Sequence, residues 1–446
     1  MDKNELADSD RRYIWHPYTQ MKDCENAPPI PIARAKGVKL YDPDGNFYYD
    51  TISSWWCNVH GHGHPAMIKA IKEQLDSLEH VLFAGFTHAP AVELAERLIG
   101  ITPPDLTKVF FSDNGSTAVE TALKMAFQYW KNTGIKGREK FLSLDMAYHG
   151  DTAGAMSVSG VNLFNSMFKP LFFPAYKAPT PYCYRCPVSK DRDTCSIDCL
   201  TRAEDILKRH SKEIAAIIIE PLLLGAGGMI VYPAAYLKGI RELSRKYDVL
   251  LIADEVATGF GRTGSMFACE HAGIQPDLMC VSKGITSGYL PLGATLATDR
   301  IYDAFYADHA ELKTFYHGHT YTANPLACSA AVASIDLFKK EDTLSNAARI
   351  NTRMRSFLRD ISDLPIVGDT RDIGVVGAIE LVRDKRTKEP FSMEQRTGFE
   401  VYRRALENNL ILRPLGDVIY FFLPLCVTDP ELEDIFGRAE KVLRSI

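Results

Sequence analysis

The sequence lacks the features that mark several classes of protein. No apolar run reaches the roughly 20 residues that a membrane-spanning helix needs. The formal net charge is −5 and there is no Lys/Arg-rich arm or basic stripe, so binding to nucleic acid is not expected. The opening residues, MDKNELADSDRRYIWHPYTQ, contain no apolar segment of the kind found in signal peptides. We therefore expect a cytoplasmic protein that does not cross a membrane.

The ten cysteines of the chain are typical of reduced thiols in the cytoplasm rather than of a disulfide framework. Cys183, Cys186, Cys195 and Cys199 form two close pairs, which would suit a tetrahedral zinc site. The eight-residue spacer between the pairs is short for a zinc ribbon, and the second pair is CxxxC. Free thiols are therefore the default expectation, with a structural metal as the alternative, and we expect no metal in the catalytic site.

Patterning along the chain predicts an α/β protein with three parts. Residues 1–63 are expected to form a short irregular arm and part of a small domain, with a hairpin around the turn Asp-Pro-Asp-Gly45. Residues 64–325 alternate strand-like and helix-like segments, which indicates a mostly parallel sheet flanked by helices. Residues 326–446 are expected to form the rest of a smaller α+β domain.

Short apolar runs bounded by charged residues predict buried strands. Ile214–Ile219 and Val249–Ala253 are such runs, and Tyr236–Lys246 between them has the pattern of a crossover helix. Further elements are expected as strands at Val109–Phe111, Phe141–Leu144, Val375–Leu381 and Val418–Phe422, and as a helix at Thr117–Trp130.

Two charged residues follow predicted strands. Asp254 comes directly after one buried strand, and Lys283 comes after a later strand that ends at Val281. One helix-sized crossover separates these strands, so both side chains are expected to face the same crevice of a parallel sheet. A desolvated lysine can act as a Schiff-base nucleophile, and a carboxylate can keep a pyridine nitrogen protonated.

A glycine turn precedes a predicted helix at Gly115 and Ser116, where free backbone N–H groups could bind a phosphate. Thr117 and Glu120 fit a capping box at the start of this helix. A plain capped turn is the alternative interpretation of this segment.

Three further residues are candidates for binding. Tyr148 could cover a flat ring, and Asp151 could orient a neighbouring group. Arg413 precedes the strand Val418–Phe422 and suits bidentate capture of a carboxylate. A structural role is the alternative for each of them.

The segment Asp254-Glu-Val-Ala-Thr-Gly-Phe-Gly-Arg-Thr-Gly264, with Ser282-Lys283-Gly284, resembles the signature of class III aminotransferases. The resemblance extends from about residue 12 to the C-terminus. It implies a fold-type I protein whose large domain has a mostly parallel, seven-stranded sheet flanked by helices, beside a smaller α+β domain. It also implies pyridoxal 5′-phosphate as the cofactor.

The resemblance implies roles for particular residues. Lys283 would form the Schiff base, Asp254 would bind the pyridine nitrogen, and Tyr148 would stack on the cofactor ring. Gly115 and Ser116 would hold the phosphate together with Thr320 of the partner subunit, which implies a homodimer with shared active sites. Glu220 would lie near the cofactor, and the expected contacts with small-molecule substrates are Tyr18, Trp55, Trp56, Gly318, Arg413 and Tyr420.

Within the family, four segments are similar to the biotin-pathway subgroup, which aminates 8-amino-7-oxononanoate to 7,8-diaminononanoate. They are Trp15–Met21, Ser53–Trp56, Tyr148–Asp151 and Met266–His271, and the tryptophan pair is the most discriminating piece. Another class III transaminase, acting on ω-amino acids or diamines, is the alternative.

The amino donor stays open between two compounds. Subgroup members that use S-adenosylmethionine often have Gly-Pro-Thr-Phe-Met in the loop that enters the partner's site. Here that loop is Gly318-His-Thr-Tyr-Thr322, which is more similar to a branch that includes lysine-using enzymes. S-adenosylmethionine is favoured slightly, because it is the commoner donor in the subgroup.

Overall fold

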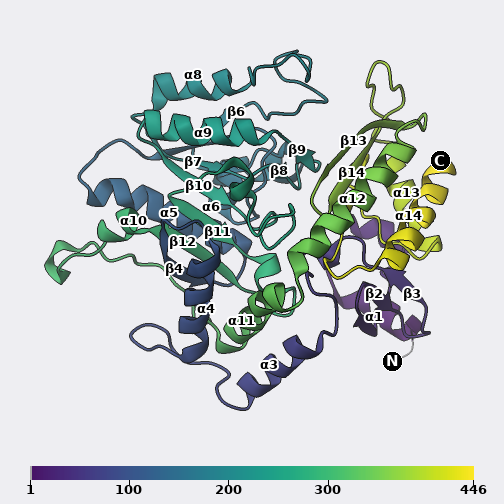
Figure 1. The fold of residues 1–446 in the computed structure, drawn as a ribbon, viewed down its shortest axis with the longest axis horizontal. Coiled ribbons are helices and arrows are strands. Elements are labelled where there is room, and N and C mark those ends of the chain that lie inside the picture. Colours follow the sequence, from purple (N-terminus) through teal and green to yellow (C-terminus); the bar gives the residue numbers. More distant parts are fainter. Residues whose placement is uncertain (1–2) are drawn as a thin grey trace.

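A computed structural model describes residues 3–446, except for the side chain of Asn162. Its centre is a seven-stranded sheet (Figure 1). Only β12 runs antiparallel to its neighbours, so the predicted mostly parallel sheet is confirmed. In spatial order the strands are β4 (Leu106–Ser112), β12 (Gly293–Thr298), β11 (Leu278–Val281), β10 (Leu250–Asp254), β7 (Ile214–Ile219), β5 (Lys140–Leu144) and β6 (Ala175–Ala178).

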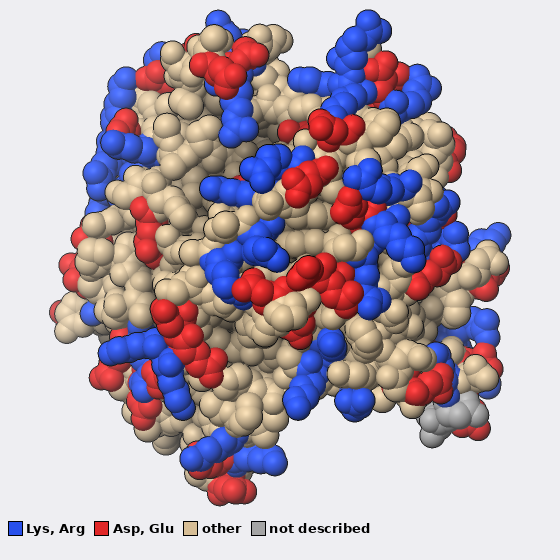
Figure 2. Space-filling model, turned by 45° about the vertical axis from the view of Figure 1, so that its right-hand side comes forward, with Lys and Arg blue, Asp and Glu red and all other residues tan. Residues whose placement is uncertain are grey.

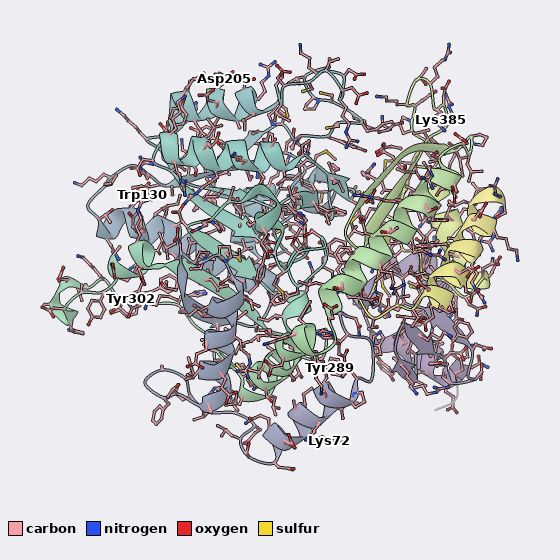
Figure 3. The ribbon with its side chains drawn as sticks, in the orientation of Figure 1. Lys72, Trp130, Asp205, Tyr289, Tyr302 and Lys385 are labelled. Atoms are coloured by element: carbon pink, nitrogen blue, oxygen red, sulfur yellow. The ribbon has the colours of Figure 1, made fainter. Side chains whose placement is uncertain are left out.

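The central strands are apolar on both faces because helices cover both faces. Residues Leu250–Ala253 of β10 belong alternately to two separate apolar clusters, and the residues of β7 are likewise divided between these two clusters. One cluster includes α5 (Gly115–Asn132) and α6 (Ala153–Val158), and the other includes α8 (Leu200–His210) and α9 (Ala234–Lys246). Trp130 of α5, labelled in Figure 3, donates from Nε1 to the carbonyl of Ala215 at 2.8 Å, which ties that helix to the sheet.

A smaller unit is built from the two ends of the chain, and Figure 1 shows the purple N-terminal strands beside the yellow C-terminal helices. Its antiparallel sheet is β13 (Val367–Ile373), β14 (Val376–Leu381) and β15 (Val418–Phe422). A second small sheet is β1 (Arg34–Lys36), β2 (Lys39–Tyr41) and β3 (Phe47–Tyr49), which confirms the predicted hairpin. The two sheets are linked where Tyr49 pairs in parallel with Leu410.

The remaining elements complete the layers around these sheets. The α-helices are α1 (Lys3–Tyr13), α2 (Ser53–Trp56), α3 (Pro65–Leu75), α4 (Ala89–Ile101), α7 (Asn162–Asn165), α10 (Asp299–Asp303), α11 (Pro325–Lys340), α12 (Thr343–Ile361), α13 (Thr397–Glu407) and α14 (Asp429–Arg444). The 3₁₀ helices and short strands are η1 (Met21–Glu25), η2 (Ser166–Leu171), η3 (Ala268–Ala272), η4 (Lys283–Thr286), η5 (His309–Glu311), β8 (Leu223–Leu224) and β9 (Ile230–Val231).

The expectation of an irregular arm is wrong for Lys3–Tyr13, which is helical. This segment contains Glu, Leu, Ala and Arg, which favour helix, and none of its residues is buried. The sequence pattern did not indicate this helix, because its polar composition gives no apolar stripe. The side chain of Lys3 pairs with Asp42 at 2.8 Å, which anchors the helix to the β2–β3 turn.

Charges of both signs are interspersed over the face shown in Figure 2. Among residues 3–446, no helix combines the length and the apolar character that crossing a membrane requires.

The ten cysteines are unpaired. Cys183, Cys186, Cys195 and Cys199 line one cavity of about 50 Å³. In the part of the chain that the structure describes, no group of three or more His, Cys, Asp or Glu is arranged to hold a metal ion. The zinc alternative therefore gains no support from this arrangement, and free thiols stay a prediction.

The four residues of α2, Ser53 to Trp56, all have positive φ, between 45° and 73°. Such a left-handed turn is unfavourable for residues with a side chain. It is held by the buried guanidinium of Arg262, which donates to Ser53 Oγ at 3.2 Å and to three backbone carbonyls, those of Trp56, Asn58 and Leu423. Arg262 therefore joins the turn to the chain after β15.

We expect Arg262→Gln to lower the free energy of unfolding by more than about 3 kcal/mol, because several buried carbonyls lose their donors. Urea unfolding followed by circular dichroism measures the change. Arg355→Gln is the control: Arg355 makes an exposed ion pair with Asp372 at 2.7 Å, whose loss costs about 1 kcal/mol or less. Equal losses in the two variants would contradict the structural role of Arg262.

Candidate active site

A cavity of about 610 Å³ lies at the carboxyl ends of β10 and β11. This is the edge at which open α/β sheets bind ligands. Predicted site residues from distant parts of the chain meet here. Those that line the cavity are Trp56, Gly115, Ser116, Tyr148, Asp151, Glu220, Asp254 and Lys283.

Lys283 follows β11 immediately, as the sequence predicts, and opens η4 with a left-handed φ of 45°. The Oγ of Ser282 donates to the carbonyl of Leu292 at 2.7 Å, which holds the turn in place. The ammonium nitrogen lies 4.8 Å from the ring centre of Trp56. Removal from water lowers the pKa of Lys283, against the opposing effect of the carboxylates of Asp254 and Glu220. A lysine in this state supplies a neutral amine more readily than a solvated one.

Asp254 is the last residue of β10 and is 4% exposed. Its Oδ1 accepts from the backbone N–H of Val256 at 3.1 Å. Its Oδ2 contacts Nδ1 of His149 at 2.7 Å. The carboxylate is therefore oriented from two sides and has its remaining acceptor capacity directed to the cavity.

Sequence reasoning missed His149. The ring is fully buried, and among the described residues its Nε2 has no hydrogen-bond partner. The signal that could have found it is its position between Tyr148 and Asp151, two residues that were singled out. Its contact with Asp254 depends on the meeting of two segments 105 residues apart in the chain.

The turn before α5 forms the cradle predicted for a phosphate. Asn114 caps the helix by accepting from the backbone N–H of Thr117 at 3.0 Å, and Thr117 completes the capping box. A Cβ added at Gly115 would lie 2.6 Å from Val256 Cγ1, so only glycine fits there. Ser116 Oγ accepts from the backbone N–H of Asp151 at 2.9 Å. The N–H groups of the first turn lie at the positive end of the helix dipole.

The predicted capping box of Thr117 with Glu120 is wrong. Glu120 accepts instead from Thr152 Oγ1 at 2.5 Å and from the backbone N–H groups of Gly154 and Ala155 at 2.7 Å and 3.1 Å. Its side chain therefore satisfies the start of α6. A local pattern could not show this, because the partners lie more than 30 residues further along the chain.

A row of aromatic and charged side chains leads outward from the cavity. Tyr18 Oη donates to Asp151 at 2.5 Å and lies 3.4 Å from Tyr148 Oη. Burial, followed by the bond to Asp151, raises the pKa of Tyr18 to about 12. The ring of Tyr18 meets that of Trp55 edge-on at 5.9 Å, and the guanidinium of Arg413 lies 4.3 Å from the Trp55 ring centre. These residues form a continuous wall outside the cavity.

Trp56 and Tyr420 form the inner part of this wall. Trp56 Nε1 donates to Tyr420 Oη at 3.1 Å, and the Trp56 ring stacks on Phe422 at 5.5 Å. Tyr420 is buried and does not line the cavity. In the structure it therefore touches Trp56 rather than the space where a substrate could lie.

Gly318 and Thr320 are the predicted site residues that lie apart from the cavity in their own chain. Both are exposed, on the segment between η5 and α11.

The residues of the cavity fit pyridoxal phosphate. Lys283 has a lowered pKa, the Asp254–His149 pair suits a protonated ring nitrogen, and the buried Nε2 of His149 has no partner among the described residues. The backbone of Gly115 and Ser116 at the start of α5 lines the cavity and suits an anion. A buried amine, a buried carboxylate and a phosphate cradle in one cavity match the three parts of this cofactor.

Comparison with known proteins gives the family. The model of class III aminotransferases matches residues 20–443. An adenosylmethionine-8-amino-7-oxononanoate aminotransferase of Geobacter sulfurreducens is 50% identical over 446 residues, covering 100% of this chain and 98% of the relative.

Two solved structures are similar over nearly the whole chain. The enzyme of the same name from Methanocaldococcus jannaschii has a TM-score of 0.95 at 43% identity, covering 100% of this chain and 99% of the other. A thermostable ω-transaminase mutant from Pseudomonas jessenii has a TM-score of 0.93 at 34% identity, covering 99% of this chain and 98% of the other. These structures confirm the fold-type I prediction, and the enzymes of this family depend on pyridoxal phosphate. The chain belongs to the class III aminotransferase family.

Proposed function

We propose that the protein transfers an amino group to 8-amino-7-oxononanoate and forms 7,8-diaminononanoate in biotin biosynthesis. The observation that carries this function is the wall of Tyr18, Trp55 and Trp56 between Lys283 and Arg413. It would suit a substrate with a ketone, an aliphatic chain and a terminal carboxylate. Relatives that carry the corresponding enzyme name, at 41–50% identity over nearly the whole chain, support the same function.

Pyridoxal phosphate, when bound, supplies a carbonyl carbon that carries the amino group and a ring that takes up electrons. Lys283 would hold the cofactor covalently, and its Nζ, once released, would take the proton from the carbon that bears the donor's amino group and later give a proton to the ketone carbon of the acceptor. Asp254 keeps the ring nitrogen protonated, with His149 holding the carboxylate in place. The backbone at Gly115 and Ser116 binds the phosphate.

The outer wall selects and orients the substrate. The guanidinium of Arg413 lies over the Trp55 ring. From this position its N–H groups could bind a carboxylate in bidentate fashion. The rings of Trp55 and Trp56 exclude water from the aliphatic chain. Tyr18 and Asp151 are bonded to each other, which places a hydroxyl and a carboxylate beside Tyr148, where an amino group of the substrate could be bound.

The competing function is that of an ω-transaminase. Structures with that name are 33–34% identical to the chain, which is lower than the identities with the relatives named as aminotransferases of 8-amino-7-oxononanoate. The tryptophan pair also favours the biotin-pathway substrate. For the donor we propose S-adenosylmethionine, which the relatives' names support, although the loop Gly318–Thr322 keeps lysine as the alternative.

We further propose that the protein is a homodimer in which Thr320 of one chain contacts the cofactor phosphate of the other. Thr320 and Gly318 are exposed and do not line the cavity of their own chain. Leu312, Tyr316 and Tyr321 on the same segment are 69%, 74% and 63% exposed. A cluster of exposed apolar side chains is typical of an interface.

We place the protein in the cytoplasm. The ten unpaired cysteines support a reducing compartment.

With 8-amino-7-oxononanoate and an amino donor, we expect the cofactor-loaded protein to form 7,8-diaminononanoate, detected by mass spectrometry. We expect Lys283→Ala to lose at least about 10²–10⁴-fold of kcat, together with the visible absorbance of lysine-bound cofactor. Lys246→Ala is the control, because Lys246 pairs with Glu204 on the surface. If the protein forms product from other amines but none from 8-amino-7-oxononanoate, it is an aminotransferase of this family with a different substrate.

We expect S-adenosylmethionine, supplied as the only donor, to support product formation, while lysine alone gives none. The same assay with each donor in turn decides the point. Product with lysine alone would show that lysine is the donor, which is the alternative that the sequence of the Gly318–Thr322 loop favours.

Shared sites predict that two inactive variants restore activity when combined. Lys283→Ala removes the lysine, and Thr320→Asp places a negative charge against the phosphate. A mixed dimer has one site with both defects and one intact site, so we expect about half of the wild-type activity. Two affinity tags isolate the mixed dimer, and each variant alone is the control. An inactive mixed dimer, or a monomer on light scattering, would rule out shared sites.

A further inference from the structure

Glu220 is a buried carboxylate that bridges two walls of the cavity. It directly follows β7 and is 4% exposed. Its Oε1 accepts a hydrogen bond from the backbone N–H of Tyr148 at 2.9 Å, and its Oε2 accepts one from the backbone N–H of Gly225 at 3.0 Å. Its carbonyl oxygen accepts from Tyr232 Oη at 2.7 Å. The carboxylate therefore fixes the positions of two backbone segments that are not joined to each other.

Each of these segments supports an aromatic wall. Tyr148 itself lines the cavity. Gly225 packs against Trp56, and a Cβ added at Gly225 would lie 3.0 Å from Trp56 Cζ3. Trp56 in turn lies next to the amine of Lys283. A shift of the Glu220 carboxylate would therefore move both aromatic rings that enclose the space beside that amine.

Two titratable groups act on the charge of Glu220: Asp254 at the end of β10 and Lys283 in η4. A third, Tyr232 after β9, faces the backbone carbonyl of Glu220 rather than its carboxylate. Burial, and then the negative charge of Asp254, raise the pKa of Glu220 to about 8, against the effect of Lys283 and the two N–H donors. Protonation would turn one acceptor oxygen into a hydroxyl and weaken one of the two N–H contacts. The walls are then held less firmly at lower pH.

We propose that Glu220 is a positioning residue that sets the width of the slot between Tyr148 and Trp56, and thereby the fit of an aliphatic keto acid. It acts through the two backbone N–H groups and touches no reacting atom. The inference rests on the proposed function, because that function assigns the substrate to the slot. A carboxylate that only stabilises the fold would change the melting temperature and leave KM and the pH profile as they are.

The direct test is Glu220→Gln in the cofactor-loaded enzyme. The amide must turn an N–H₂ group toward one of the two N–H donors, so we expect KM for 8-amino-7-oxononanoate to rise about tenfold. We expect kcat to change by less than about threefold, because no group that moves a proton is lost. In the wild type we expect kcat/KM to fall as the pH decreases through about 8, and we expect the variant to lack this limb.

Gly225→Ala separates position from charge. Its added methyl group presses on Trp56 and leaves the Glu220 carboxylate intact, so we expect a raised KM with the limb near pH 8 retained. Glu380→Gln is the matched control, because Glu380 is a buried carboxylate held by Arg371 in the small sheet. For Glu380→Gln we expect an unchanged KM for 8-amino-7-oxononanoate.

Glu220→Gln with an unchanged KM and an unchanged pH profile would overturn the proposal, whatever happens to its melting temperature. Failure of the proposed function gives a different result, since the wild type would then form no diaminononanoate with either donor. In that event the visible absorbance of bound cofactor decides the question without turnover. A transition near pH 8 in the wild type that Glu220→Gln lacks supports the positioning role, and identical titrations reject it.

Discussion

One buried guanidinium holds the turn that carries Trp55 and Trp56 to the loop after β10 and to the chain after β15. Arg262 lies in the loop after β10, and its donors reach Ser53, Trp56, Asn58 and the carbonyl of Leu423. A left-handed turn of four non-glycine residues is unfavourable by itself. With this clamp the turn presents Trp55 outward and Trp56 inward. The substrate wall therefore depends on a contact made far from any reacting atom.

At the base of the cavity, too, hydrogen bonds from the surrounding chain stabilise an arrangement that is unfavourable by itself. Lys283 also has a left-handed backbone, and it lies beside two buried carboxylates, those of Asp254 and Glu220. Buried carboxylates without partners would be strongly unfavourable. Here backbone N–H groups and His149 satisfy them. The chain thus uses main-chain donors, which cannot move away, to fix the positions of these two carboxyl groups beside the amine of Lys283.

The sequence was sufficient for five strands of the sheet and for the residues at their carboxyl ends, but β6 and the antiparallel β12 were not predicted. Runs such as Ile214–Ile219 are apolar on both faces, and a parallel sheet brings residues at the carboxyl ends of its strands, such as Asp254 and Lys283, to one side. The contacts of His149 and Glu120 escaped prediction because their partners lie far along the chain. A left-handed turn without glycine also has no local signal. The domain boundaries at 63/64 and 325/326 stay a prediction.

The loop Gly318–Thr322, whose sequence bears on the choice between the two donors, does not line the cavity of its own chain. Gly318 and Thr320 do not line the cavity of their own chain, while the walls that we propose for the keto acid, around Trp55, Trp56 and Arg413, come from within one chain. In the proposed dimer, therefore, each site would take its keto-acid specificity from one subunit and part of its donor specificity from the other. Substitutions in the loop could then change the donor without altering the keto-acid wall.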